Sequence, residues 1–198
     1  MKNLTRTLAL ISYFALASLS LNATAAAVID FGTGLAGPGG TLSYDGVNTI
    51  GTNINIGGLT AEATPAGAGT YAVTALLNFN TAANTISIVG DVPDLGIPAG
   101  TTLLTGSFSS STYTAIPGAG GGLTEIFSGQ GPDVKDPGLL AALGLPANTP
   151  FDFFGFSIES VNGTVVSTDI VNTAVPVPAA VWLFGSGLLG LVGIARRR

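Results

Sequence analysis

Carboxylates, hydroxyls and one interior lysine are the side chains that could do acid–base chemistry in the body of this 198-residue chain, which has no histidine and no cysteine. It therefore has no imidazole base, no thiolate nucleophile and no zinc site of the usual kind. The nearest carboxylate pairs are Asp91 with Asp94 and Asp133 with Asp136. Two carboxylates suffice for glycoside hydrolysis, but acids in short loops usually cap turns. We expect no catalytic residue and no enzymatic activity. A glycosidase that uses only carboxylates is an alternative, and it ranks below the two hypotheses given at the end of this section.

The same four aspartates are the candidate metal ligands. Ca²⁺ takes six to eight oxygen ligands from carboxylates and backbone carbonyls, and loop acids offer such oxygens. No Asp-x-Asp-x-Asp-Gly loop is present, so solvated turn acids are the favoured interpretation. A structural calcium ion at Asp91, Asp94, Asp133 or Asp136 is the alternative, and we expect no other cofactor.

The charges are distributed unevenly along the chain. All 11 acidic residues lie between Asp30 and Asp169, and the interior 28–174 contains a single basic residue, Lys135, which gives it a net charge of −10. Such a body repels phosphate backbones, so we expect no nucleic-acid partner. It also has no arginine to hold a substrate carboxylate or phosphate by two parallel hydrogen bonds.

Short apolar or alternating runs, separated by Gly, Asn, Asp and Pro, predict strands rather than helices over most of the interior. We expect an all-β, antiparallel β-sandwich, jelly-roll-like, with about nine strands and one short helix. The expected strands cover residues 27–31, 41–44, 54–63 (broken by Gly57-Gly58), 71–79, 85–92, 101–108, 112–116, 151–161 and 164–171. Residues 118–122 are rich in glycine and predict a flexible connector rather than a phosphate loop.

Local turn and cap residues give the sharpest structural predictions. Asn162-Gly163 predicts a two-residue hairpin, because both residues accept the positive φ of a type I′ turn. In the strand before it, Phe154, Phe156 and Ile158 share one face. Aromatic residues on both faces predict that the aromatic-rich half of the strand is covered on both sides. Asp136 as N-cap and Pro137 as N1 predict a helix over 136–145.

Both ends of the chain read as export signals. Lys2 and Arg6, an apolar core over 8–21 and small residues up to position 27 predict a secretory signal peptide, cleaved after Ala25 or Ala27 by signal peptidase. Residues 179–195 form an uncharged apolar run that can span a bilayer as a helix. Three terminal arginines place its end on the cytoplasmic side, and Trp182 lies where an interfacial aromatic is favoured.

The order of proline motif, short span and arginine cluster resembles the PEP-CTERM sorting signal of exopolysaccharide-producing Gram-negative bacteria. The matching residues are Val175, Pro176, Val177, Pro178, Ala179 and Ala180, the Trp182-Leu183-Phe184-Gly185-Ser186-Gly187 stretch, and Arg196, Arg197 and Arg198. Val177 stands where the family has a central Glu, in what looks like a recurrent Val-Pro-x-Pro-Ala variant. The resemblance implies that an exosortase, a membrane protease, recognises and removes the tail at the cell surface. A permanent membrane anchor is the alternative.

Three segments follow from these signals: a signal peptide (1–27), a secreted β-sandwich domain (28–174) and a sorting signal (175–198). The leading hypothesis is an exported structural or adhesive protein of the cell surface or exopolysaccharide matrix, attached to the membrane only through its C-terminal segment. The rival is a carbohydrate-binding module, with or without Ca²⁺, that stacks sugars on exposed aromatics. Tyr44, Tyr71, Tyr113 and the phenylalanines of 151–156 are its candidates, although aromatics at strand spacing more often form a core.

Overall fold

The computed structural model of the protein describes residues 26–118, 122–152 and 154–175, and Ala26–Val175 forms one compact unit. Residues 1–25 of the predicted signal peptide and the predicted sorting helix, with Pro176, Val177, Pro178, Trp182 and the three arginines, lie outside the described residues. The alternative cleavage site at Ala27 and the first motif residue, Val175, lie inside them. Within the described ranges no helix is long and apolar enough to cross a membrane. The elements are β1 (Val28–Gly32), η1 (Gly34–Ala36), β2 (Thr41–Tyr44), β3 (Thr49–Glu62), β4 (Gly69–Asn80), β5 (Thr85–Val92), η2 (Pro93–Leu95), β6 (Ile97–Gly106), β7 (Ser110–Pro117), β8 (Leu123–Gly131), β9 (Asp133–Lys135), α2 (Pro137–Ala142), β10 (Phe154–Val161) and β11 (Thr164–Thr173).

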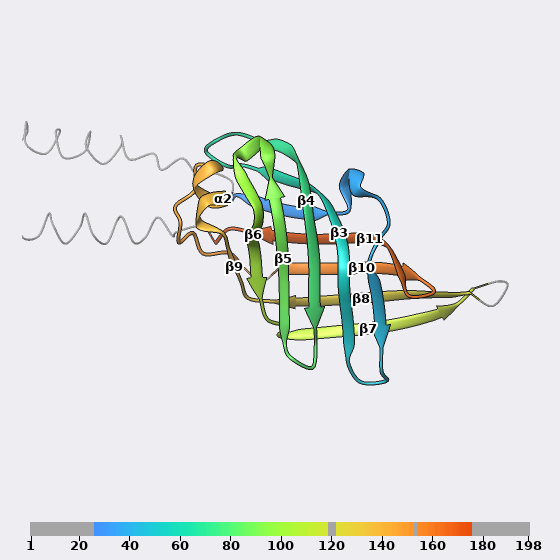
Figure 1. Ribbon diagram of the computed structural model, residues 1–198. Coiled ribbons are helices and arrows are strands. Elements are labelled where there is room, and N and C mark those ends of the chain that lie inside the picture. Colours follow the sequence, from blue (N-terminus) through green and yellow to red (C-terminus); the bar gives the residue numbers. More distant parts are fainter. Residues whose placement is uncertain (1–25, 119–121, 153, 176–198) are drawn as a thin grey trace, which may run out of the picture. The chain divides into compact units, whose positions relative to one another are not determined.

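The described strands form one antiparallel sheet that bends over itself. Its order is β7-β8-β10-β11-β1-β3-β4-β5-β6-β9, and the short β2 pairs with β3 and β11. The bend lies at β3, whose first half pairs with β2 and whose second half pairs with β1. In Figure 1 the strands β3 to β6 run across β7, β8, β10 and β11, so the sheet forms two layers. The prediction of an all-β, antiparallel fold with one short helix is confirmed.

Phenylalanines from both layers meet in the core. Phe79 of β4 stacks on Phe127 of β8 with ring centroids 4.8 Å apart, and it meets Phe156 of β10 edge-on at 5.2 Å. Phe108, between β6 and β7, contacts the same rings. Each buried aromatic ring removes a large apolar area from water, so this cluster, with the aliphatic core residues around it, helps to hold the layers together.

The turn and cap predictions are confirmed. Asn162 and Gly163 have φ of 50° and 78° and join β10 to β11 as an antiparallel hairpin. The helix is α2, and the Asp136 side chain accepts a hydrogen bond from the Leu139 N–H at 2.8 Å. Its leucines pack into the core, so the cap holds the helix against the edge of the sheet.

The strand predictions were wrong in part. The glycines Gly57 and Gly58 do not break the strand predicted over 54–63, because β3 runs continuously from Thr49 to Glu62 with shifts of register near them. A Cβ at Gly57 would lie 2.5 Å from the backbone oxygen of Thr33, so this glycine allows η1 to pack closely on the strand. The strands β8 and β9 were missed: glycines and polar residues hide the alternation of β8, and β9 has only three residues, in a segment that was predicted as a loop.

Coverage on both faces was predicted only for the aromatic-rich half of the strand over 151–161, where Phe151 packs against the core and residue 153 lies outside the described residues. Phe154, Phe156 and Ile158 are buried, but Ser157 and Glu159 on the opposite face are exposed. No second layer packs on that outer face within the described part of the chain. The predicted connector at 118–122 joins β7 to β8, and the Gly118 N–H donates to the Gly122 carbonyl at 2.7 Å.

Candidate functional site

The single basic residue of the interior lies in a buried ion pair. The Lys135 Nζ donates to Asp133 Oδ2 at 2.7 Å, and both side chains are inaccessible to solvent. Residues two apart on a strand point to the same face, so β9 aims both side chains inward. The same spacing in the sequence was the signal that could have predicted the pair.

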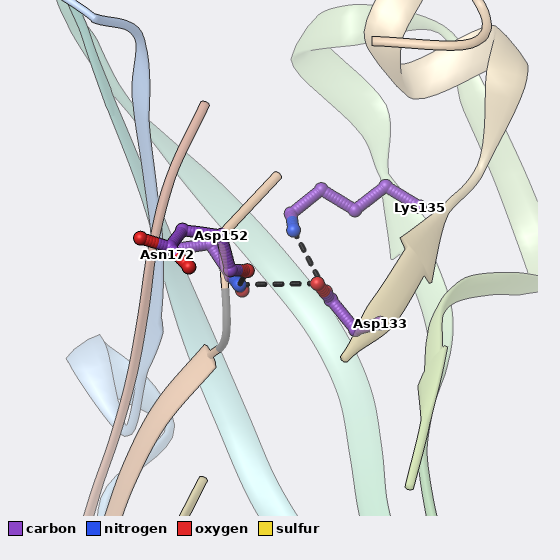
Figure 2. A network of polar contacts seen from close by, with 4 residues as sticks. All are labelled: Asp133, Lys135, Asp152 and Asn172. Atoms are coloured by element: carbon purple, nitrogen blue, oxygen red, sulfur yellow. Dashed lines mark hydrogen bonds and ion pairs between the residues drawn. The ribbon is translucent and has the colours of Figure 1, made fainter. Parts of the chain in front are cut away.

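A short polar network extends this ion pair to the opposite layer (Figure 2). The Asn172 side-chain amide on β11 donates to Asp133 Oδ1 at 3.1 Å and to the Asp152 carbonyl at 3.3 Å. The Asp152 N–H in turn donates to the Thr173 carbonyl at 2.8 Å. The network therefore ties β9, at one end of the sheet, to β11 and to the segment that leads into β10.

A cavity of about 340 Å³ lies beside the network, lined by Lys135, Leu140, Asn148, Thr149 and Phe151 among others. The Lys135 ammonium lies 3.8 Å from the centre of the Phe151 ring, a distance at which a cation and an aromatic face attract each other. Phe151, predicted as core or sugar platform, packs against the core and also covers the lysine. With its charge paired and covered, Lys135 is unsuited to binding an anionic ligand.

Burial disfavours the charged forms of both Asp133 and Lys135. It raises the pKa of Asp133, although Lys135 and the Asn172 amide act in the opposite direction. Burial also lowers the pKa of Lys135, against the attraction of Asp133. Two ions taken out of water need each other to remain charged. The pair is therefore suited to fixing a geometry rather than to exchanging protons with a substrate.

The network lies beside the segment where the described chain ends. The Val175 N–H donates to the Pro150 carbonyl at 2.9 Å, and the Ala174 N–H donates to the Ala27 carbonyl. Phe151 also forms an isolated bridge with Ala174. The last residues before Pro176 are thus held by backbone hydrogen bonds on two sides.

A second polar cluster joins β7, β8, β10 and the turn between β10 and β11. It was not predicted from the sequence. The Glu125 carboxylate on β8 accepts hydrogen bonds from the Tyr113 hydroxyl and the Ser160 hydroxyl, both at 2.7 Å, and from the Gly163 N–H at 2.8 Å. Tyr44 stacks on Tyr113 with ring centroids 4.0 Å apart. Because Tyr44 remains 42% exposed, its ring is an aromatic surface that a sugar can reach.

The structure gives three of the four candidate calcium ligands other partners. Asp133 pairs with Lys135, Asp136 caps α2, and Asp91 accepts from the Thr74 N–H at 3.2 Å. Asp94 lies exposed in the first turn of η2. No group of three or more His, Cys, Asp or Glu that could hold a metal is found among the described residues. The calcium site stays a prediction.

An open hollow lies on the outer face of β4 and β5. It has a volume of about 650 Å³ and is lined mainly by apolar residues, including Leu35, Leu76 and Val89, with Asp91 at its border. Few polar groups converge there to orient a ligand, whereas binding sites usually combine an apolar wall with several such groups. Tyr71, the third tyrosine predicted as a platform, packs against the core.

An acidic pair on the outer face of β1 and β11 predicts a pH dependence. Burial, the hydrogen bond and charge of Asp169, and the charge of Glu62 raise the pKa of Asp30 to about 6. A raised pKa means that the folded protein holds the proton of Asp30 more tightly than the unfolded chain does. The stability that this proton contributes is fully present below about pH 4 and is lost as the pH rises through about 6.

We expect Asp30→Asn to stabilise the protein by about 1 kcal/mol at neutral pH, where solvent screening reduces the repulsion it removes. The change should have little effect near pH 4. Urea unfolding at both pH values measures the difference, with the exposed Asp94→Asn as a control. An equal gain at both pH values would contradict the assignment.

The whole chain was compared with known proteins. No protein-family model matches it, and neither a curated protein nor a solved structure shows significant similarity.

Proposed function

We propose that this chain is an exported, non-enzymatic protein of a Gram-negative cell surface or exopolysaccharide matrix, with a structural or adhesive role. Its sorting tail is recognised and removed by an exosortase-like membrane protease. The observation that carries the proposal is the position of the tail motif: the compact unit ends at Val175, which is the first residue of the motif, and the first proline of the motif, Pro176, follows it.

The backbone around Val175 supports this arrangement. The hydrogen bonds to Pro150 and Ala27 and the buried ion pair beside them keep the folded part of the chain from fraying into the tail. The domain, which we propose to be a jelly-roll-like β-sandwich, remains intact after the tail is removed.

The terminal arginines should be required for removal of the tail. We expect the wild-type protein recovered from the surface of its producer to end upstream of residue 196, and a variant with Arg196, Arg197 and Arg198 replaced by alanine to keep its tail. Intact-mass spectrometry measures both. A wild-type surface protein that retains its three arginines would reject the sorting role and leave a permanent anchor.

Carbohydrate binding is the second candidate, favoured by the exposed ring of Tyr44. Its stacking on Tyr113 and the hydrogen bond that its hydroxyl donates to the Gly46 carbonyl fix the ring, and a fixed aromatic ring binds a sugar face at low entropic cost. A glycan array probed with the protein, with Ca²⁺ and with chelator, tests this role. Binding lost in Tyr44→Ala but kept in Tyr71→Ala would support it, and no binding would reject it.

A further inference from the structure

One end of the sheet is an open edge. The strand β7 (Ser110–Pro117) is the last strand in the order and pairs only with β8 among the described strands. Its eight residues pair with β8 without a shift of register, so the edge is straight. Figure 1 shows β7 at the border of its layer.

The alternation of the ladder shows which backbone groups face outward. In an antiparallel pair, residues with both groups bonded to the neighbour alternate with residues whose groups point away. The Gly118 N–H donates to the Gly122 carbonyl, so residue 118 is one whose backbone groups face β8. Every second residue before it does the same, and the even-numbered residues of β7 are therefore bonded to β8. The N–H and C=O groups of Ser111, Tyr113 and Ala115 therefore point to the open edge.

This edge lacks the devices that usually prevent pairing. Natural edge strands are short, or carry charges, bulges or proline. The other end of the sheet shows two of these devices, since β9 has three residues and carries the inward-pointing Lys135. The strand β7 contains no charged residue, and its proline, Pro117, is the final residue.

We propose that β7 pairs with β7 of a second copy of this chain, antiparallel and centred on Tyr113. The segment 111–115 reads Ser-Thr-Tyr-Thr-Ala, so reversal about Tyr113 places threonine opposite threonine and serine opposite alanine. This register uses every outward-facing group of 111, 113 and 115 and forms about six hydrogen bonds. The contact is the same on both copies, as a two-fold dimer requires.

The charge of the body favours a second copy at this edge over a charged partner. A domain with one lysine among 11 acids repels its own copies, except where the contacting surfaces are uncharged. The edge strand is such a surface. Paired threonines on neighbouring strands add a favourable side-chain contact, and here each of the two threonines meets its counterpart.

Introduced cysteines test both the pairing and its register, because the chain has none of its own. At the proposed interface Thr112 lies opposite Thr114 of the second copy in a non-hydrogen-bonded pair, with Cα atoms about 4.5 Å apart, a separation that a disulfide spans. We expect a mixture of Thr112→Cys and Thr114→Cys full-length chains to form covalent dimers on mild oxidation. Either variant alone should form few covalent dimers, because identical positions do not lie opposite each other in this register.

Charge placed on the edge provides the second measurement. Thr112→Lys/Thr114→Lys sets lysines opposite each other and should weaken dimerisation by about tenfold or more, as measured by sedimentation equilibrium. Thr102→Lys/Thr105→Lys adds the same charge to exposed positions of β6 and should leave it unchanged. Monomeric wild-type protein without cross-linking would overturn the proposal, and efficient cross-linking of either single variant would overturn the register.

Discussion

Replacing Lys135 by methionine is expected to lower the free energy of unfolding by about 3–5 kcal/mol, because it leaves the Asp133 carboxylate buried without its cation. Methionine keeps an unbranched apolar side chain against Phe151, and a sulfur atom beside an aromatic ring is a favourable contact. The loss is therefore assigned to the unpaired charge rather than to an empty cavity. Denaturant unfolding at neutral pH measures it.

The loss should become smaller in acid, because burial already raises the pKa of Asp133 and removal of Lys135 raises it further. A raised pKa means that stability is lost as the pH rises, so protonation at low pH restores part of it. Asp133→Asn/Lys135→Met removes both charges and keeps an acceptor for Asn172. We expect it to be within about 1 kcal/mol of the wild type or more stable.

Val134→Met is the matched control, because Val134 lies between the paired residues but is 70% exposed. It should change stability by no more than about 0.5 kcal/mol. If Lys135→Met behaved like this control, the ion pair would not be the contact that fixes this end of the domain.

The second large effect concerns Glu125. We expect Glu125→Ala to cost about 3 kcal/mol, because it leaves the Ser160 hydroxyl and the Gly163 N–H without their acceptor and removes a charge-assisted hydrogen bond from Tyr113. Thermal and denaturant unfolding measure the loss. Glu159→Ala, on the exposed face of the neighbouring strand, should be nearly neutral.

The pH dependence of this effect has the opposite sign to that of Asp30. Burial alone would raise the pKa of Glu125, but its three hydrogen-bond donors lower it below the ordinary value of 4.5. A lowered pKa contributes stability that is present above about pH 4.5 and is lost as the pH falls through the folded-state value. Glu125→Gln should reduce this loss of stability at low pH, as measured by the free energy of unfolding between about pH 3 and 6. An unchanged loss would contradict the role of the carboxylate.

The sequence predicted the turns and helix starts that are determined by one or two residues. Asn162-Gly163 fixed a hairpin because few other residues accept positive φ at both turn positions. Asp136 fixed the start of α2 for a similarly local reason, the N–H groups at the start of a helix that need an acceptor. Such features need no knowledge of what lies across the sheet.

The features that sequence reasoning missed depend on partners distant in the chain. Glu125 accepts from Ser160, 35 residues away, and Asp133 contacts Asn172 across 39 residues. Nothing in either residue's neighbourhood indicates such a partner, because strand order is set by the packing of the whole sheet. The exposed outer face of β10 at Ser157 and Glu159 also depends on distant parts of the chain, since the sequence does not say which faces a second layer covers.

The position of β11 in the sheet has a mechanical consequence. The chain leaves the described domain directly after this strand, which lies between β10 and β1 and is hydrogen-bonded along both sides. A pulling force applied through the C-terminal tail therefore loads an interior strand, and two ladders must yield before it can be drawn out. A tail attached to an edge strand would give way after the loss of one ladder, so this end of the chain resists a pulling force better than an edge strand would.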